Sequence, residues 1–176
     1  MTGSGLFPAL ATVAALLIVS GLAKMRDPDT ARAALAVLRL PSAGVVVRAA
    51  GAVEIGVGLA CILDPTTATM GAVMVLYISF AVMVAAHLLL HSTVSCGCFG
   101  ASSTPSSPIH LSFNLAAAVT AAVALRSDVP SSIDLVSSRP VAGVVCALAV
   151  ASAVLMARAV LTLLPSALGA YEGTHE

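Results

Sequence analysis

Five long apolar runs constrain the fold of this chain more than any other feature of its sequence. A helix needs about 20 mostly apolar residues to cross a bilayer, and each run comes close to that length. Hydrophobic residues make up 59% of the 176 residues and charged residues 9%, which is too apolar for a soluble domain. The sequence therefore predicts an all-α, polytopic membrane bundle of about five transmembrane helices. The predicted spans are Leu6–Ala23, Gly44–Leu63, Ala68–Leu90, Ile109–Leu125 and Val141–Leu164.

The spans divide the chain into two predicted parts. Residues 1–125 hold four spans and a polar loop, and residues 126–176 hold a linker, the fifth span and a short polar tail. Met1–Pro8 contains no Lys or Arg, so the first span is expected to be retained rather than removed as a secretory signal. The net charge is zero, and nothing in the charge pattern indicates a nucleic acid partner.

Local signals predict where two helices begin and which helix face packs. Asp27-Pro28 is typical of an N-cap followed by proline at the first helical position, and Ser107-Pro108 repeats that signal at the fourth span. Small residues allow close packing in lipid, so Gly51, Gly56 and Gly58 predict a packing face on the second span. The helix after Pro28 is expected to be short, amphipathic and interfacial. Its predicted apolar side holds Ala31, Leu35 and Leu38, away from Arg32 and Arg39.

Basic residues predict the orientation in the membrane. Arg126 and Arg139 lie in the last loop, whereas the first loop, Lys24–Pro41, holds four basic residues. The positive-inside rule places the first loop in the cytoplasm, and helix parity then places the loop His91–Pro108 on the same face. The four basic residues of the first loop are Lys24, Arg26, Arg32 and Arg39.

The loop His91–Pro108 contains the strongest chemical signal, Cys96-Gly97-Cys98-Phe99-Gly100. The ring of a disulfide between Cys96 and Cys98 would be small and strained, which favours reversible exchange over a permanent link. Two thiolates with His91 or His87 are also a donor set for Cu(I) or Zn(II). A third interpretation is a pair of buried structural cysteines, which the polar, glycine-containing loop disfavours.

Polar residues in the spans predict a series of buried groups below this loop. At 1.5 Å per residue, Glu54 lies about 15 Å deep in the second span, with Ser79 or Tyr77 of the third span near its level. By the same rise, His87 and Asn114 lie about 5–8 Å below the loop. An ionisable group inside a membrane is a functional hypothesis by default, and the alternative for Glu54 is a helix-packing hydrogen bond.

Three histidines surround the cysteine loop in the sequence. His87 and His91 have the i, i+4 spacing of one helix face, and His110 stands in the first turn of the next helix. A nearby imidazolium and a helix N-terminus both favour the thiolate, the attacking species in disulfide exchange. The alternative is that these histidines mark the water boundary.

The remaining cysteines, Cys61 and Cys146, are predicted near the opposite membrane face. A second redox pair there would give a route for electrons across the membrane. The favoured interpretation is that each behaves as a small apolar residue in a helix.

The quoted segments also form a pattern along the chain. Ser20-Gly21-Leu22-Ala23-Lys24-Met25-Arg26-Asp27-Pro28 closes the first span, and Glu54 lies in Val53-Glu54-Ile55-Gly56-Val57-Gly58-Leu59. Cys96-Gly97-Cys98-Phe99-Gly100 follows the third span, and Asn114 lies early in the fourth. Together these residues resemble the MauE (methylamine utilisation) family, related to the DoxX-like membrane proteins, over about residues 5–125.

The resemblance implies a role in disulfide formation or thiol redox of exported proteins, often beside a thioredoxin-like partner, with the cysteines facing the exported compartment. It marks Lys24, Glu54, Cys96, Cys98 and Asn114 as functional positions. Phe113 departs from the pattern, because the family often has Arg before the Asn.

The leading hypothesis is therefore a multi-pass protein of the plasma (inner) membrane that exchanges a Cys96/Cys98 disulfide with a partner dithiol. The partner would be a thioredoxin-like or exported thiol protein, and a quinone is the candidate cofactor. The alternatives are a protein that handles soft metals (copper or zinc) and a non-catalytic subunit of a membrane complex.

Overall fold

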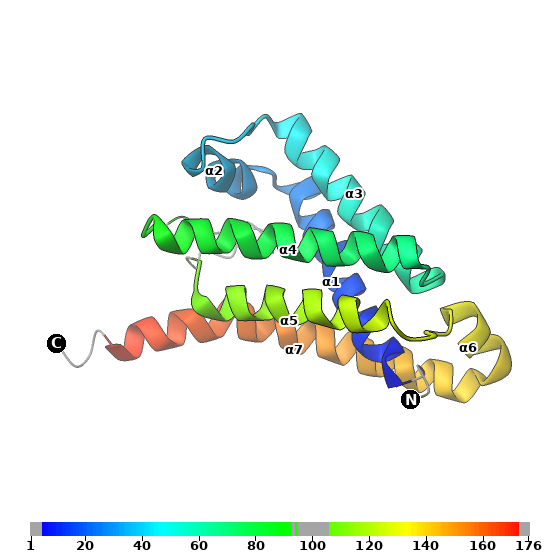
Figure 1. The fold of residues 1–176 in the computed structure, drawn as a ribbon. Helices are drawn as coiled ribbons and strands as arrows, with labels where there is room; N and C mark the ends of the chain where they lie inside the picture. Colours follow the sequence, from blue (N-terminus) through cyan, green and yellow to red (C-terminus); the bar gives the residue numbers. More distant parts are fainter. Residues whose placement is uncertain (1–4, 93, 95–105, 173–176) are drawn as a thin grey trace.

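The described part of the chain is entirely helical. The computed structural model describes residues 5–92, 94 and 106–172, with side chains as far as Leu161. Seven helices and no strands lie within these residues (Figure 1). They are α1 (Phe7–Arg26), α2 (Asp29–Val37), α3 (Gly44–Leu63), α4 (Thr67–Leu89), α5 (Pro108–Ala124), α6 (Ser132–Ser138) and α7 (Pro140–Glu172).

Four of these helices are long and apolar enough to cross a membrane. They are α1, α3, α4 and the part of α7 from Pro140 to Leu161. The fifth apolar helix, α5, has 17 residues and is about 26 Å long, against a hydrocarbon core of about 30 Å. The predicted polytopic helical bundle is confirmed.

The bundle has two ends that matter for the site. α1 packs along α3, α4 packs along α5, and α7 lies against α1. In Figure 1, α2, the end of α4 and the start of α5 gather at one end, which we call the loop end. The start of α1 and the short helix α6 lie at the opposite end (Figure 1).

Two glycines of α3 allow α1 to approach closely. A Cβ added to Gly51 would lie 2.8 Å from the carbonyl oxygen of Gly21, and one added to Gly58 would lie 2.6 Å from that of Ala14. Small residues at such an interface let helix backbones pack tightly in lipid. The prediction that Gly56 shares this face is wrong, because nothing lies within 4 Å of a Cβ built there.

The apolar core lies between α1, α4, α5 and the end of α3. Tyr77 of α4 is buried in this core, and its hydroxyl donates a hydrogen bond to the carbonyl oxygen of Val13 in α1, at 2.7 Å. Its ring also makes edge contacts with Phe80 and Phe113, at centroid distances of 6.0 and 6.3 Å. Tyr77 therefore joins three helices of the bundle.

The predicted helix starts are close to the observed ones, but the capping differs. α2 begins at Asp29, one residue later than predicted, and Asp27 Oδ1 accepts a hydrogen bond from the Asp29 N–H. α5 begins at Pro108 as predicted, but the Ser107 hydroxyl pairs with the His110 ring instead of capping the backbone. In both places the polar side chain forms a hydrogen bond with a residue two or three positions further along the chain.

The C-terminal part departs most from the prediction. The predicted linker contains α6, whose N-cap Ser131 accepts a hydrogen bond from the Asp134 N–H at 3.0 Å. The predicted fifth span, Val141–Leu164, lies within α7, and the helix continues beyond it to Glu172. Pro165 favours an end at Leu164, but proline is tolerated inside membrane helices.

Candidate functional site

A buried ion pair joins α1 to α3 near the loop end. Lys24 Nζ donates hydrogen bonds to Glu54 Oε2 at 2.9 Å and to Ser20 Oγ at 2.7 Å. The two charged side chains are 8% and 2% exposed. The ammonium also lies 5.1 Å from the ring centroid of Phe80 in α4. Three helices therefore surround this charge.

The helix packing explains why these side chains meet. Ser20 and Lys24 are four residues apart on α1, and Gly51, Glu54 and Gly58 share one face of α3 at spacings of three and four residues. A Cβ on Gly51 would lie 3.1 Å from the Cβ of Lys24, so the glycine makes room for the lysine stem. The close approach of the two helices thus positions the pair.

The sequence placed Lys24 in the first loop, and that prediction is wrong. Lys24 lies in the last turn of α1 and is buried. A lysine next to Arg26 and Asp27 looks like a loop residue until its acidic partner is known. Pairing with Glu54 offsets part of the large cost of burying either charge alone.

A small cavity adjoins the ion pair. It has a volume of about 120 Å³ and lies between α1, α2, α3 and α4. Its polar wall consists of Lys24 and Glu54, and α2 covers it with Ala31 and Leu35. The remaining lining residues are Val47, Ala50, Phe80 and Met83.

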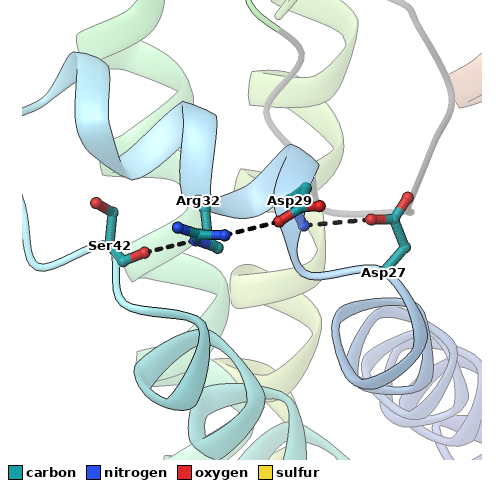
Figure 2. A network of polar contacts seen from close by, with 4 residues as sticks. All are labelled: Asp27, Asp29, Arg32 and Ser42. Atoms are coloured by element: carbon teal, nitrogen blue, oxygen red, sulfur yellow. Dashed lines mark hydrogen bonds and ion pairs between the residues drawn. The ribbon is translucent and has the colours of Figure 1, made fainter.

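Exposed polar side chains form a network around α2 (Figure 2). Arg32 Nη1 donates to Asp29 Oδ1 at 2.8 Å, and Arg32 Nε donates to the carbonyl oxygen of Ser42 at 3.0 Å. Asp27 Oδ1 accepts from the Asp29 N–H at 3.2 Å. The network therefore connects α2 to the chain before and after it. Arg32 is exposed and Ala31 is buried, in agreement with the predicted placement of Arg32 away from the apolar side.

A second polar group lies where α4 ends and α5 begins. His87 is fully buried, and neither of its ring nitrogens has a hydrogen-bond partner in the described part of the chain. The Ser106 hydroxyl is also buried without a described partner. His110 Nδ1 lies 2.8 Å from Ser107 Oγ, and Asn114 is buried one turn further along α5.

The pairing of α4 with α5 brings these residues toward the same end. Val84 of α4 packs against Leu111 of α5, and the rings of Tyr77 and Phe113 meet further from the loop end. His87 lies one turn beyond Val84, at the level of the first turn of α5. Buried polar atoms without partners are rare in proteins, and each needs an explanation.

The prediction that His87 and His91 share a helix face is wrong. α4 ends at Leu89, and His91 is exposed with a left-handed φ of 48°. The Ser92 N–H bonds to the carbonyl of His87 and the His91 N–H to that of Leu88, which is the Schellman pattern of a helix end. The helix therefore ends before His91, so His91 does not lie on the helix face that carries His87.

A comparison with known families connects these residues. The sequence model of the family described as "Methylamine utilisation protein MauE" matches residues 4–127. The chain belongs to the MauE family. With its several apolar helices, it is a multi-pass membrane protein. No curated protein and no solved structure gives a significant match to the chain.

The MauE match includes all of the residues predicted to form the site, and it ends before α6 and α7. Of the positions marked by the family resemblance, Lys24 and Glu54 pair directly, whereas Asn114 lies on α5 beside the histidine group. The described hydrogen bonds and ion pairs do not join Glu54 to His87 or Asn114. Cys96 and Cys98 lie outside the described residues.

The predicted partners of Glu54 in the third span are wrong. Ser79 is exposed and donates back to the carbonyl of Val75 in its own helix, at 2.8 Å. Tyr77 faces the apolar core. The observed partner of Glu54 is Lys24. Ser20, which also bonds to Lys24, was not among the predicted site residues, although its position four residues before Lys24 indicates a shared helix face.

The other cysteines have separate surroundings. Cys61 is buried in the apolar core near the opposite end, and Cys146 is half-buried against a mostly apolar cavity of about 390 Å³. Both are free thiols. Within the described residues, no three His, Cys, Asp or Glu side chains are grouped as metal ligands. The predicted soft-metal set includes Cys96 and Cys98, which lie outside that part.

Proposed function

We propose that this MauE family protein is a membrane thiol–disulfide exchange protein whose reactive groups are Cys96 and Cys98. The observation that carries the proposal is the buried imidazole of His87, which has no hydrogen-bond partner among the described residues and lies near the end of α4, the helix that precedes the cysteine segment in the sequence. In the sequence, Cys96 and Cys98 follow His87 by nine and eleven residues and precede His110 by fourteen and twelve.

The proposed reaction needs a thiolate and a disulfide. A thiolate of the reduced partner attacks one sulfur of the Cys96–Cys98 disulfide, forming a mixed disulfide and releasing the other cysteine as a thiolate. The second partner thiolate then attacks the mixed disulfide. The partner leaves oxidised, and Cys96 and Cys98 are left reduced, having accepted two electrons. The reverse sequence oxidises Cys96 and Cys98.

The buried groups at the loop end have supporting roles in this proposal. His87 and His110 accept and return the protons that leave and rejoin the thiols, and the positive end of the α5 dipole favours a nearby thiolate. Asn114, buried one turn after His110 on α5, is a further polar group beside them. Exposed His91 supplies a further imidazole at the surface. Thiolate character governs how fast a cysteine exchanges.

The proposed acceptor or donor of electrons is a thioredoxin-like or exported thiol protein. A quinone dissolved in the membrane is the candidate non-protein acceptor, since it takes two electrons and two protons from a dithiol and becomes a quinol. The proposed location is the plasma (inner) membrane.

The side of the membrane that the cysteine segment faces decides which protein partner can reach it. Arg26, Arg32, Arg39 and Arg48 lie at the end of α1, in and after α2 and near the start of α3, whereas Arg126 and Arg139 lie between α5 and α7. The positive-inside rule then predicts a cytoplasmic cysteine segment. Impermeant maleimide should label Cys96 and Cys98 only after the cells are permeabilised. Labelling of intact cells would contradict this orientation and indicate an exported thiol partner.

The redox state of the purified protein tests the function. Mass-tag alkylation across a series of dithiothreitol ratios should show two thiols appearing together, and the transition should be absent in Cys96→Ser. The same transition should persist in Cys61→Ser, the matched control. Thiols that stay reduced in every buffer would overturn the proposal.

Two further outcomes identify the alternatives. Stoichiometric copper or zinc that is lost in Cys96→Ser would indicate a protein that handles soft metals. Full activity in cells of the Cys96→Ser/Cys98→Ser variant, with loss of activity when Gly58 is enlarged, would indicate a non-catalytic subunit of a membrane complex.

A further inference from the structure

The cavity beside the Lys24–Glu54 pair is built as a binding site. It combines two charged side chains, each more than nine-tenths buried, with six apolar residues from three helices. The cysteine exchange proposed above assigns it no part. A buried polar pair that faces an apolar cavity is the arrangement of a small-molecule site, in which a few polar groups orient an apolar body.

The hydrogen bonding of the pair defines what the ligand must carry. Lys24 Nζ is already surrounded by Ser20 Oγ, Glu54 Oε2 and the Phe80 ring. The described hydrogen bond to Glu54 uses Oε2 only, so Oε1 retains its capacity to accept. A ligand with a hydroxyl or N–H donor would satisfy this oxygen. Because the two protein charges cancel, a neutral ligand avoids the cost of burying a third charge.

The volume of the cavity limits the size of the ligand. An apolar cavity of about 150 Å³ engineered in another protein binds benzene. The present cavity, at about 120 Å³, accommodates a body close to a single ring. Its wall consists of Val47, Ala50, Phe80 and Met83, together with the two residues of α2, and it matches an apolar or aromatic body.

α2 and Ala50 lie between the cavity and the protein surface. Ala31 and Leu35 cover the cavity, and the Arg32–Asp29 ion pair of α2 is exposed. The buried residues Ala31 and Ala34 pack α2 against the bundle. Ala50, which lines the cavity, is itself exposed on the surface of α3.

We propose that this cavity binds a small neutral molecule with a ring-sized apolar body and one hydroxyl or N–H group, which donates a hydrogen bond to Glu54. Phenol is the simplest probe of that chemistry, and benzene is the matched control without the donor. The proposal does not depend on Cys96 or Cys98, so binding should be unchanged in Cys96→Ser/Cys98→Ser.

Methionine methyl resonances give a direct assay on the full chain in detergent micelles. Met83 lines the cavity, whereas exposed Met156 on α7 reports partition of the probe into the micelle. Phenol should shift the Met83 methyl signal saturably and the Met156 signal only in proportion to concentration. Benzene should bind at least tenfold more weakly. No saturable shift of Met83 would overturn the proposal, and equal binding of benzene would overturn the role of the donor.

Two neighbouring alanines supply matched variants. Ala50→Leu adds bulk to the wall of the cavity while keeping both charged residues, and should abolish the saturable shift. Ala49→Leu makes the same change at an exposed position that does not line the cavity, and should leave binding intact. Circular dichroism confirms that both variants fold. Undiminished phenol binding in folded Ala50→Leu would show that the probe binds elsewhere.

Discussion

Breaking the Lys24–Glu54 pair should destabilise the protein more than any surface substitution. Lys24→Met leaves the Glu54 carboxylate without its described partner, and Glu54→Leu leaves the ammonium with Ser20 and the Phe80 ring as its remaining described contacts. Removing one partner of a buried ion pair typically costs about 3–5 kcal/mol. We expect each single variant to lose that much free energy of unfolding.

The double variant should recover most of the loss. Lys24→Met/Glu54→Leu removes both charges and leaves apolar side chains between helices that already pack closely. Replacing a buried pair by apolar residues is often neutral or stabilising by about 1–4 kcal/mol. The coupling energy of the cycle should therefore be at least about 3 kcal/mol, well beyond the 0.5 kcal/mol or so of independent sites.

Equilibrium unfolding in mixed micelles, followed by helical circular dichroism, measures these four free energies. The exposed pair Arg32–Asp29, with side chains 48% and 78% exposed, is the matched control. Arg32→Ala should cost no more than about 1 kcal/mol. If Lys24→Met and Glu54→Leu each cost as little as the control, or if their losses simply add in the double variant, the reasoning about a buried, coupled pair is refuted.

Four further substitutions test the helix packing by the same unfolding measurement. Gly58→Ala should lose about 1–3 kcal/mol, because its Cβ meets the carbonyl of Ala14, whereas Gly56→Ala, with open space around it, should gain up to about 1 kcal/mol. His91→Gly should stabilise by about 1 kcal/mol by removing the cost of a left-handed residue at φ 48°, and a loss would contradict the Schellman end. Tyr77→Phe should cost about 1 kcal/mol by removing the hydrogen bond to Val13, and an unchanged stability would refute that contribution.

The membrane helices could be predicted from the sequence because the bilayer sets their length. The bounds of α3 agree with the predicted Gly44–Leu63, and Ser107-Pro108 marks the start of α5 correctly. The helix α6 was missed because its seven residues lie in a polar linker, where the cap Ser131 has no long apolar run after it. The continuation of α7 beyond Leu164 was not expected, because Pro165 favours a helix end there.

The candidate site was only partly predictable, because the sequence gives the depth of a residue in the membrane but not the helix that its side chain faces. Depth along a helix follows from residue number, and it placed Glu54, His87 and Asn114 inside the bundle, where all three are buried. Which side of each helix faces which neighbour depends on packing. The glycines of α3 draw α1 close and deliver Lys24 to Glu54, which the sequence had assigned to partners on the third span.

Trapping a mixed disulfide tests the proposed thiol exchange most directly. Cys96→Ser and Cys98→Ser should be expressed separately in cells, acid-quenched and alkylated, and examined on non-reducing gels with mass spectrometry of any adduct. We predict that one of the two variants carries a partner protein through the remaining cysteine, released by reductant and absent from the double variant. If neither variant forms an adduct and both thiols of the native protein stay reduced, the proposed thiol–disulfide exchange is contradicted.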